Sequence, residues 1–108
     1  MTITVTNTNA TLLSLLSANQ RIQAENNRGG SVRYSVTIYN PSVTAGEIIY
    51  TELGAVSTVN SLPLFPGSSG VGGDSRQYFT GDLSKINLLA SVASIANVVV
   101  EIEPATIT

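Results

Sequence analysis

The sequence contains no cysteine and no histidine, and only 11% of its 108 residues are charged. The absence of cysteine excludes disulfide bonds and thiolate metal sites, although it leaves the redox compartment open. The absence of histidine removes the side chain that most often performs general acid–base catalysis near neutral pH. We therefore expect no metal site, no cofactor and no enzymatic activity.

The shortage of charge is pronounced, since an ordinary soluble domain has roughly 25% charged residues. Apolar residues make up 43% of the chain. The surface must therefore consist largely of Thr, Ser, Asn and Gly, with few charges to keep neighbouring molecules apart. This composition favours permanent assembly with other chains, and a small extracellular β-domain with a Ser/Thr-rich surface would explain it equally well.

The remaining composition limits the kinds of partner. The net charge is −2 and the five basic residues are scattered, so no basic patch is available for nucleic acid. No apolar run is long enough to span a membrane, and the N-terminus lacks the basic and apolar regions of a secretory leader. We expect neither nucleic acid nor a membrane as partner. The length predicts one domain over residues 1–108.

Alternation of apolar and polar residues predicts strands along most of the chain. Thr2–Thr6 has threonines on one face and forms an N-terminal strand or arm within residues 1–9. The clearest pattern is Ser31–Tyr39, and Glu47–Glu52 follows closely enough to be its antiparallel neighbour. Three further strands are expected: Gln77–Thr80, Ile86–Ser91 and Asn97–Glu103. A hairpin around residues 93–94 is expected to join the last two, and a C-terminal tail over 104–108 to follow them.

One short helix is expected near the N-terminus. Leu12, Leu15 and Leu16 fit one helical face and predict a helix over Ala10–Ala18. The pattern then weakens, so Asn19–Gly30 is expected to be a polar loop. Short strands separated by turn signals at intervals of about eight to twelve residues are typical of an all-β sandwich or barrel.

The centre of the chain combines proline, glycine and large apolar residues. The segment Leu62–Gly67 is expected to be extended but poorly paired, because proline cannot donate a hydrogen bond to a strand ladder. Its three large apolar side chains are expected to be buried. Pro66-Gly67 fits a type II turn, in which glycine takes a positive φ. The glycine- and serine-rich run over 67–75 is expected to be mobile or held by something outside the domain.

No motif in the sequence carries catalytic chemistry. The segment 67–70 lacks the glycine spacing of a nucleophile elbow, because position 71 is Val. The glycines at 70–73 lack the lysine and the flanking strand and helix of a phosphate loop. Glu101 and Glu103 share one strand face and would suit a carboxylate pair, but solvated side chains on a terminal strand are the simpler interpretation.

The order of segments resembles the small β-sandwich proteins of tailed-bacteriophage virions, namely capsid decoration or cement proteins and related head-fibre base domains. The resemblance covers nearly the whole chain. It implies an all-β fold, a small jelly-roll-like β-sandwich with one short N-terminal helix. It also implies assembly on the capsid surface, often as homotrimers that reinforce contacts between major capsid proteins, and no catalytic residues. The segments that carry it are Thr2–Leu16, Val36–Ser42, Ile48–Thr51, Leu62–Gly67, Gly81–Ile86 and Asn97–Glu103.

Candidate interface residues follow from this hypothesis. The loop 67–74 and the segment Met1–Asn9 are expected to need a partner to become ordered. Arg33, on the polar face of a strand, and Arg76, at the start of another, suit the role of interface anchors, with ordinary surface arginines as the alternative. The complete candidate set is Gly67, Ser68, Ser69, Gly70, Val71, Gly72, Gly73, Asp74, Arg76, Arg33, Thr2 and Thr4.

An alternative function is a receptor- or glycan-binding fibre module of a phage virion. Four tyrosines would then form a platform for sugar rings, although core or rim positions are the more ordinary interpretation of tyrosines in strands: Tyr34, Tyr39, Tyr50 and Tyr78. A hydrolase is disfavoured by the missing histidine.

Overall fold

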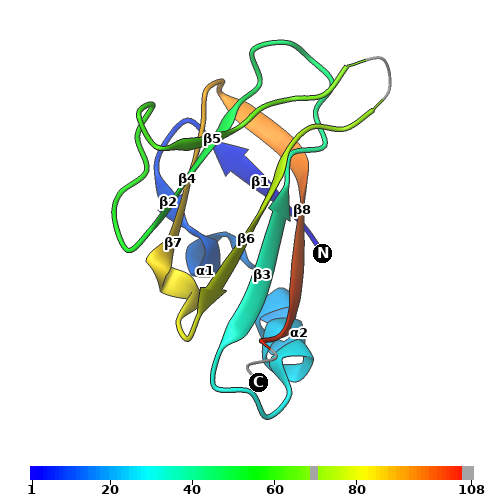
Figure 1. Ribbon diagram of the computed structural model, residues 1–108, viewed down its shortest axis with the longest axis vertical. Helices are drawn as coiled ribbons and strands as arrows, with labels where there is room; N and C mark the ends of the chain where they lie inside the picture. The colour runs from blue at the N-terminus through cyan, green and yellow to red at the C-terminus, as the bar shows by residue number, and fades with distance from the viewer. Residues whose placement is uncertain (69–70, 106–108) are drawn as a thin grey trace.

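The computed structural model describes residues 1–68 and 71–105 and contains two four-stranded antiparallel sheets that enclose one core (Figure 1). In sheet A the order is β1-β8-β3-β6, and in sheet B it is β2-β7-β4-β5. This arrangement confirms the predicted all-β, sandwich-like fold. The strands of sheet A are β1 (Thr2–Thr6), β3 (Tyr34–Tyr39), β6 (Ser75–Thr80) and β8 (Ser94–Pro104). Those of sheet B are β2 (Ala10–Thr11), β4 (Ile49–Leu53), β5 (Leu62–Leu64) and β7 (Ile86–Ala90).

The core lies between the two sheets and is filled by alternate residues of their strands. Sheet A contributes Val36, Ile38 and Val100, all completely buried. Sheet B faces them with the equally buried Ile49 and Leu88. Successive side chains of a strand point to opposite faces, so the alternate apolar residues of these strands meet in the core.

Strand β3 begins later than the sequence pattern predicted. Both of its neighbours end opposite Tyr34, β8 with Pro104 and β6 with Thr80. No partner backbone remains for the preceding residues, so Val32 is 84% exposed and lies outside the strand. The C-terminal tail is also shorter than expected, because Pro104 belongs to β8. Residues 106–108 lie outside the described part.

Two strand pairings expected from sequence proximity are wrong. Strand β4 lies in sheet B and therefore does not pair with β3. Strands β7 and β8 also lie in different sheets, so the connection over 91–93 crosses between the sheets and is not a hairpin. Burial explains both results, because each sheet must cover the apolar face of the other.

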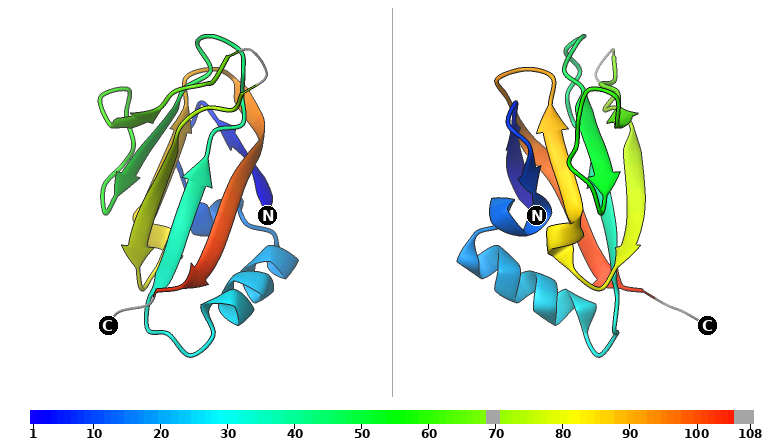
Figure 2. Two further views of the ribbon diagram at one scale, coloured as in Figure 1. Left: turned by 45° about the vertical axis from the view of Figure 1, so that its right-hand side comes forward. Right: turned by 90° about the vertical axis from the view of Figure 1, so that its left-hand side faces the viewer.

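The helical region differs most from the prediction. The first helix, α1, covers only Leu12–Leu15, and residues 19–28, expected as a loop, belong to a second helix, α2 (Ala18–Arg28). Ser17 starts α2 with a capping box, in which its hydroxyl accepts from the Gln20 backbone and the Gln20 side chain accepts in return. Figure 2 shows α2 across one end of the sandwich. No helix among residues 1–68 and 71–105 is long and apolar enough to cross a membrane.

The segment Leu62–Gly67 does not bury all three of its large apolar side chains, contrary to the prediction from the sequence. Leu64 is fully buried, but Leu62 is 50% and Phe65 51% exposed. Leu62–Leu64 forms β5, an edge strand of sheet B, where Pro63 is tolerated because an edge strand needs fewer N–H donors. Gly67 does not have the positive φ of the predicted type II turn.

Candidate interaction surface

The predicted interface residues do not come together on one surface. The loop around Gly67–Asp74 and Arg33, in the α2–β3 connection, lie at opposite ends of the molecule (Figure 1). Thr2 and Thr4 lie on the outer face of β1, with exposed side chains. Ser69 and Gly70 lie outside the described residues. The set therefore marks three separate regions.

The described part of the glycine loop is held by the chain itself, contrary to the expectation that an external partner orders it. The Gly67 N–H donates to the Ser42 carbonyl at 2.8 Å, and the Gly73 N–H donates to the Asn40 carbonyl at 3.0 Å. A Cβ on Gly72 would lie 1.2 Å from the Tyr39 hydroxyl. These glycines are therefore explained by close packing between segments, and not by flexibility.

Asn40 is the hydrogen-bonding centre of this end of the molecule. Its side chain is completely buried, and its amide nitrogen donates to the carbonyls of Glu47 and Leu64, both at 2.9 Å. Its side-chain oxygen accepts from the Ser42 N–H at 3.1 Å. The Asn40 backbone is also hydrogen-bonded to the glycine loop, because its N–H donates to the Asp74 carbonyl at 3.0 Å. The sequence analysis assigned no role to Asn40.

Arg76 points into the sandwich and is not an exposed anchor. Its guanidinium donates to the Thr51 hydroxyl at 3.3 Å, and the same hydroxyl lies 2.6 Å from that of Tyr78. Thr51 belongs to sheet B, so this cluster links β6 to the opposite sheet. A charge that points inward from an edge strand also discourages another strand from pairing there.

The N-terminal segment is likewise ordered without a partner. The N-terminal ammonium group donates to the Val100 carbonyl at 3.0 Å, and β1 pairs with β8. Helix α2 also contacts β1, because the Gln20 side-chain amide donates to the Thr2 carbonyl at 2.7 Å. The backbone of Thr2 and Thr4 therefore belongs to an ordered strand and not to a free arm, while their side chains are exposed.

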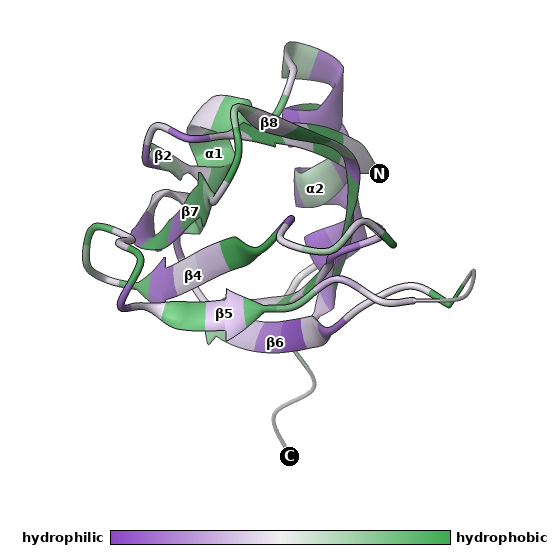
Figure 3. Ribbon diagram, turned by 90° about the horizontal axis from the view of Figure 1, so that it is seen from above, coloured by the Kyte–Doolittle hydropathy of each residue, from purple (hydrophilic) through white to green (hydrophobic). Residues whose placement is uncertain are grey.

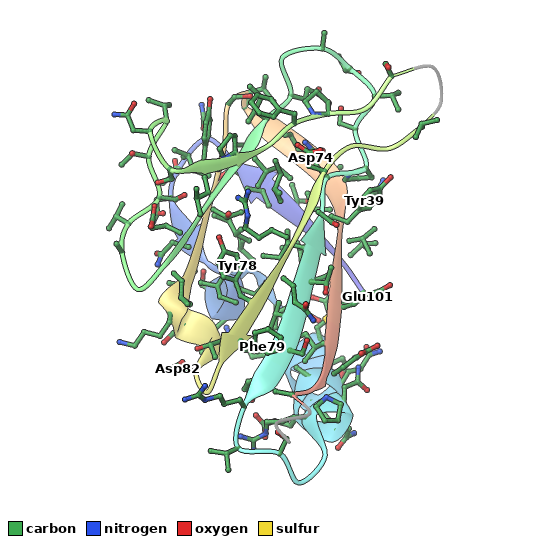
Figure 4. The ribbon with its side chains drawn as sticks, in the orientation of Figure 1. Tyr39, Asp74, Tyr78, Phe79, Asp82 and Glu101 are labelled. Carbon is green, nitrogen blue, oxygen red and sulfur yellow. The ribbon has the colours of Figure 1, made fainter. Side chains whose placement is uncertain are left out.

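The tyrosines cannot form the four-ring sugar platform of the alternative hypothesis. Tyr34 and Tyr78 are buried in the core. Tyr78 and Phe79 point to opposite faces of β6 (Figure 4), which leaves Phe79 as the exposed ring of that strand. Only Tyr39 and Tyr50 remain half-buried.

The acidic residues of the described part lie apart from one another, in groups of fewer than three. Glu101 and Glu103 share the outer face of β8 and are exposed, as the sequence predicted. Among the residues that the structure describes, no group of three or more potential metal ligands occurs. Asp82 caps the short 3-10 helix η1 (Leu83–Lys85), and the hydrogen bonds from Ser84 lower the pKa of its carboxyl group.

Helix α2 is attached to the sandwich through Tyr34. The Tyr34 hydroxyl donates to Glu25, and Arg28, which forms an ion pair with Glu25 at 2.9 Å, lies over the Tyr34 ring at 5.1 Å. Burial, followed by the hydrogen bond to Glu25, raises the pKa of Tyr34 above its ordinary value. The protonated phenol is therefore the form that the folded state favours.

This contact predicts a loss of stability at high pH. The contribution of Tyr34 is fully present below the pKa of an unfolded tyrosine, about 10, and is lost as the pH rises through the higher folded-state pKa. We expect urea unfolding to show a steeper alkaline decline for the wild type than for Tyr34→Phe. Equal declines above pH 10 would contradict this assignment.

The surface feature that the sequence analysis missed is an apolar row of five exposed residues, each three positions from the next: Leu53, Val56, Val59, Leu62 and Phe65. The row follows the end of β4, the β4–β5 loop (residues 54–61) and β5. Figure 3 shows this connection with hydrophobic segments beside β4 and β5. The spacing of three is visible in the sequence, but it matches neither a helix nor a strand and was not interpreted.

Exposed apolar side chains on an ordered segment are available for contact with a partner protein. Comparison with models of known protein families, with curated proteins and with solved structures found no match for this chain.

Proposed function

We propose that the chain is a structural protein of a tailed-phage virion, a cement or decoration subunit on the outer capsid surface. It would bind the lattice and stabilise contacts between major capsid proteins, without catalytic activity. The proposal starts from the resemblance of the sequence to such proteins. The observation that supports it best is the apolar row, because exposed apolar side chains release free energy when another protein covers them.

The scarcity of charge supports the same proposal. A charged group at an interface must lose its hydration, which can cancel the Coulombic gain, so an uncharged surface suits permanent contact. Each contact can be weak, since a micromolar contact corresponds to about 8 kcal/mol. A homotrimer would bind the repeating lattice through several such contacts at once, which strengthens binding without new interactions.

The proposal predicts that capsids lose stability without this chain. In the phage that encodes it, deletion of the gene should lower the temperature at which particles release DNA, measured with a dye that fluoresces on exposed DNA. Purified chain added back should restore the wild-type temperature, because the lattice sites remain intact. Unchanged release temperatures would overturn the proposal. Reduced adsorption to cells with unchanged capsid stability would favour the fibre-module alternative.

A further inference from the structure

The two sheets have four edge strands, and three of them are poorly suited to pair with another chain. Strand β2 has only two residues, and β5 has three, including Pro63, which has no N–H. In β1 the register with β8 shifts between Ile3 and Val5, and the Thr2 carbonyl already accepts from Gln20. Strand β6 has six residues, no proline and no shift in its register with β3. Within residues 1–68 and 71–105, β6 is therefore the one long and regular edge.

The hydrogen bonds of β3 determine which backbone groups of β6 face the open side. The Ala105 N–H donates to the Arg33 carbonyl at 3.2 Å, and the Asn40 N–H donates to the Asp74 carbonyl at 3.0 Å. Successive residues of a central antiparallel strand bond to alternate neighbours, so the odd-numbered residues of β3 bond to β8 and the even-numbered ones to β6. The register then leaves the N–H and C=O groups of three β6 residues directed to the open side: Ser75, Gln77 and Phe79.

Arg76 lies on this edge strand and has no carboxylate partner. Its side chain points inward and is partly buried. Its guanidinium, which has five N–H groups, donates to the Thr51 hydroxyl at 3.3 Å. Asp74, the acid nearest in sequence, accepts instead from the backbone N–H that follows β5. The only ion pair among the described residues joins Arg28 to Glu25. Arg76 therefore retains hydrogen-bonding capacity for a carboxylate.

This arginine restricts which strand can be added to the edge. A strand paired with β6 would cover the Arg76 guanidinium, and a charge buried without a partner is strongly unfavourable. Strands in general are thus rejected, whereas an aspartate or glutamate facing Arg76 would accept two parallel hydrogen bonds from the guanidinium. Rejection of other strands and acceptance of this one together produce specificity. A second copy of β6 does not qualify, because Ser75–Thr80 contains no acid.

We propose that the free edge of β6 binds an extended protein segment that carries one carboxylate opposite Arg76. The outward backbone groups supply the main-chain hydrogen bonds, as in other complexes formed by strand addition, and Arg76 supplies the selectivity. The exposed side chains of Gln77 and Phe79 lie beside the alternate side chains of the added strand. The inference goes beyond the proposed function and does not depend on it, since the edge would select the same kind of segment in any assembly.

The test begins with a display library of random peptides of about eight residues, within the usual length of a strand. Peptides selected on the immobilised chain should share one aspartate or glutamate within an alternating pattern. Isothermal titration calorimetry then compares one selected peptide on the wild type, Arg76→Gln and Arg33→Gln. We expect Arg76→Gln to bind at least about thirtyfold more weakly, because the peptide carboxylate loses its partner. Arg33 is exposed and lies outside β6, so Arg33→Gln should bind as the wild type does.

A second variant, Gln77→Pro, tests the backbone part of the contact and leaves Arg76 in place. It removes an N–H that faces the open side and none of the bonds to β3, so the chain should fold, which thermal melts verify. We expect it to bind at least about tenfold more weakly. In the free wild type, the N–H groups of Gln77 and Phe79 should exchange rapidly with deuterium, and they should become protected when the peptide binds.

Three results would overturn the inference. The first is a selection that enriches no peptide, or only peptides without a shared acid. The second is binding that Arg76→Gln leaves unchanged. The third is binding that depends on Arg76 but neither weakens in Gln77→Pro nor protects the outward N–H groups, because it would reduce the contact to an ion pair and exclude strand addition.

Discussion

Replacing Asn40 by alanine should lower the free energy of unfolding by about 3–5 kcal/mol, because buried carbonyl groups left without a partner cost about 1–3 kcal/mol each. The substitution removes the two side-chain N–H bonds to Glu47 and Leu64 and the acceptor for the Ser42 N–H. All of these groups belong to the end of the molecule where the β3–β4 connection, β5 and the glycine loop meet. Equilibrium unfolding in urea, followed by circular dichroism, measures the change.

Asn60→Ala is the control for this prediction. Asn60 is exposed in the β4–β5 loop, so its replacement should change stability by no more than about 0.5 kcal/mol. Asn40→Asp adds a second check, since the carboxylate keeps an acceptor for Ser42 but has no N–H donors for the two carbonyls. If Asn40→Ala were as stable as Asn60→Ala, the central role of Asn40 would be disproved.

The second large effect is expected for Gly73→Ala. A Cβ at this position would lie 2.1 Å from the Phe65 carbonyl oxygen and 2.9 Å from the Gly67 nitrogen, both backbone atoms. The two sides of the loop would have to separate, and overpacking of this kind typically costs about 1–3 kcal/mol. This separation would also weaken two hydrogen bonds, from the Asp74 N–H to the Phe65 carbonyl and from the Gly73 N–H to the Asn40 carbonyl.

Gly30→Ala is the matched control, because no atom lies within 4 Å of its added Cβ. This substitution should leave stability unchanged or raise it slightly by restricting the unfolded chain. Urea unfolding of both variants distinguishes close packing from flexibility. Should Gly73→Ala be as stable as the wild type, the glycine loop would have to be looser than the structure indicates.

The strands were predictable where one face is buried and the other exposed. Thr2–Thr6 has the bounds expected from its alternation, since a period of two identifies the buried face directly. Which sheet a strand joins was not predictable. The connection between β3 and β4 is short enough for a hairpin. Strand β4 nevertheless belongs to the opposite sheet, because the two sheets must cover each other's apolar faces.

Helix α2 escaped prediction because it lacks an apolar face. Ala24 is its only residue classed as buried, and Ile22 lies exposed. Contacts of polar side chains hold it, such as Gln20 with Thr2 and Glu25 with Tyr34. The one local signal was the capping-box pair Ser17 and Gln20, which predicts a helix start even without an apolar pattern.

The candidate surface was predicted poorly for a similar reason. Glycine content identified the loop over 67–74 as unusual, but composition does not distinguish a flexible loop from one in which backbones pack closely. The interface role of the two arginines was predicted from residue type. The contacts of Arg76 instead follow from its inward position on β6. In the β4–β5 loop Ser57 is buried and the neighbouring valines are exposed, a reversal that residue type does not predict.

The proposal that this chain is a decoration subunit can be tested by measuring its binding to capsids. Capsids that lack the chain would be mixed with increasing amounts of the purified protein, sedimented, and analysed for bound protein per major capsid protein. Binding should saturate at a fixed ratio, because the lattice presents a defined number of equivalent sites. Absent binding, or binding that rises without a plateau, would contradict it.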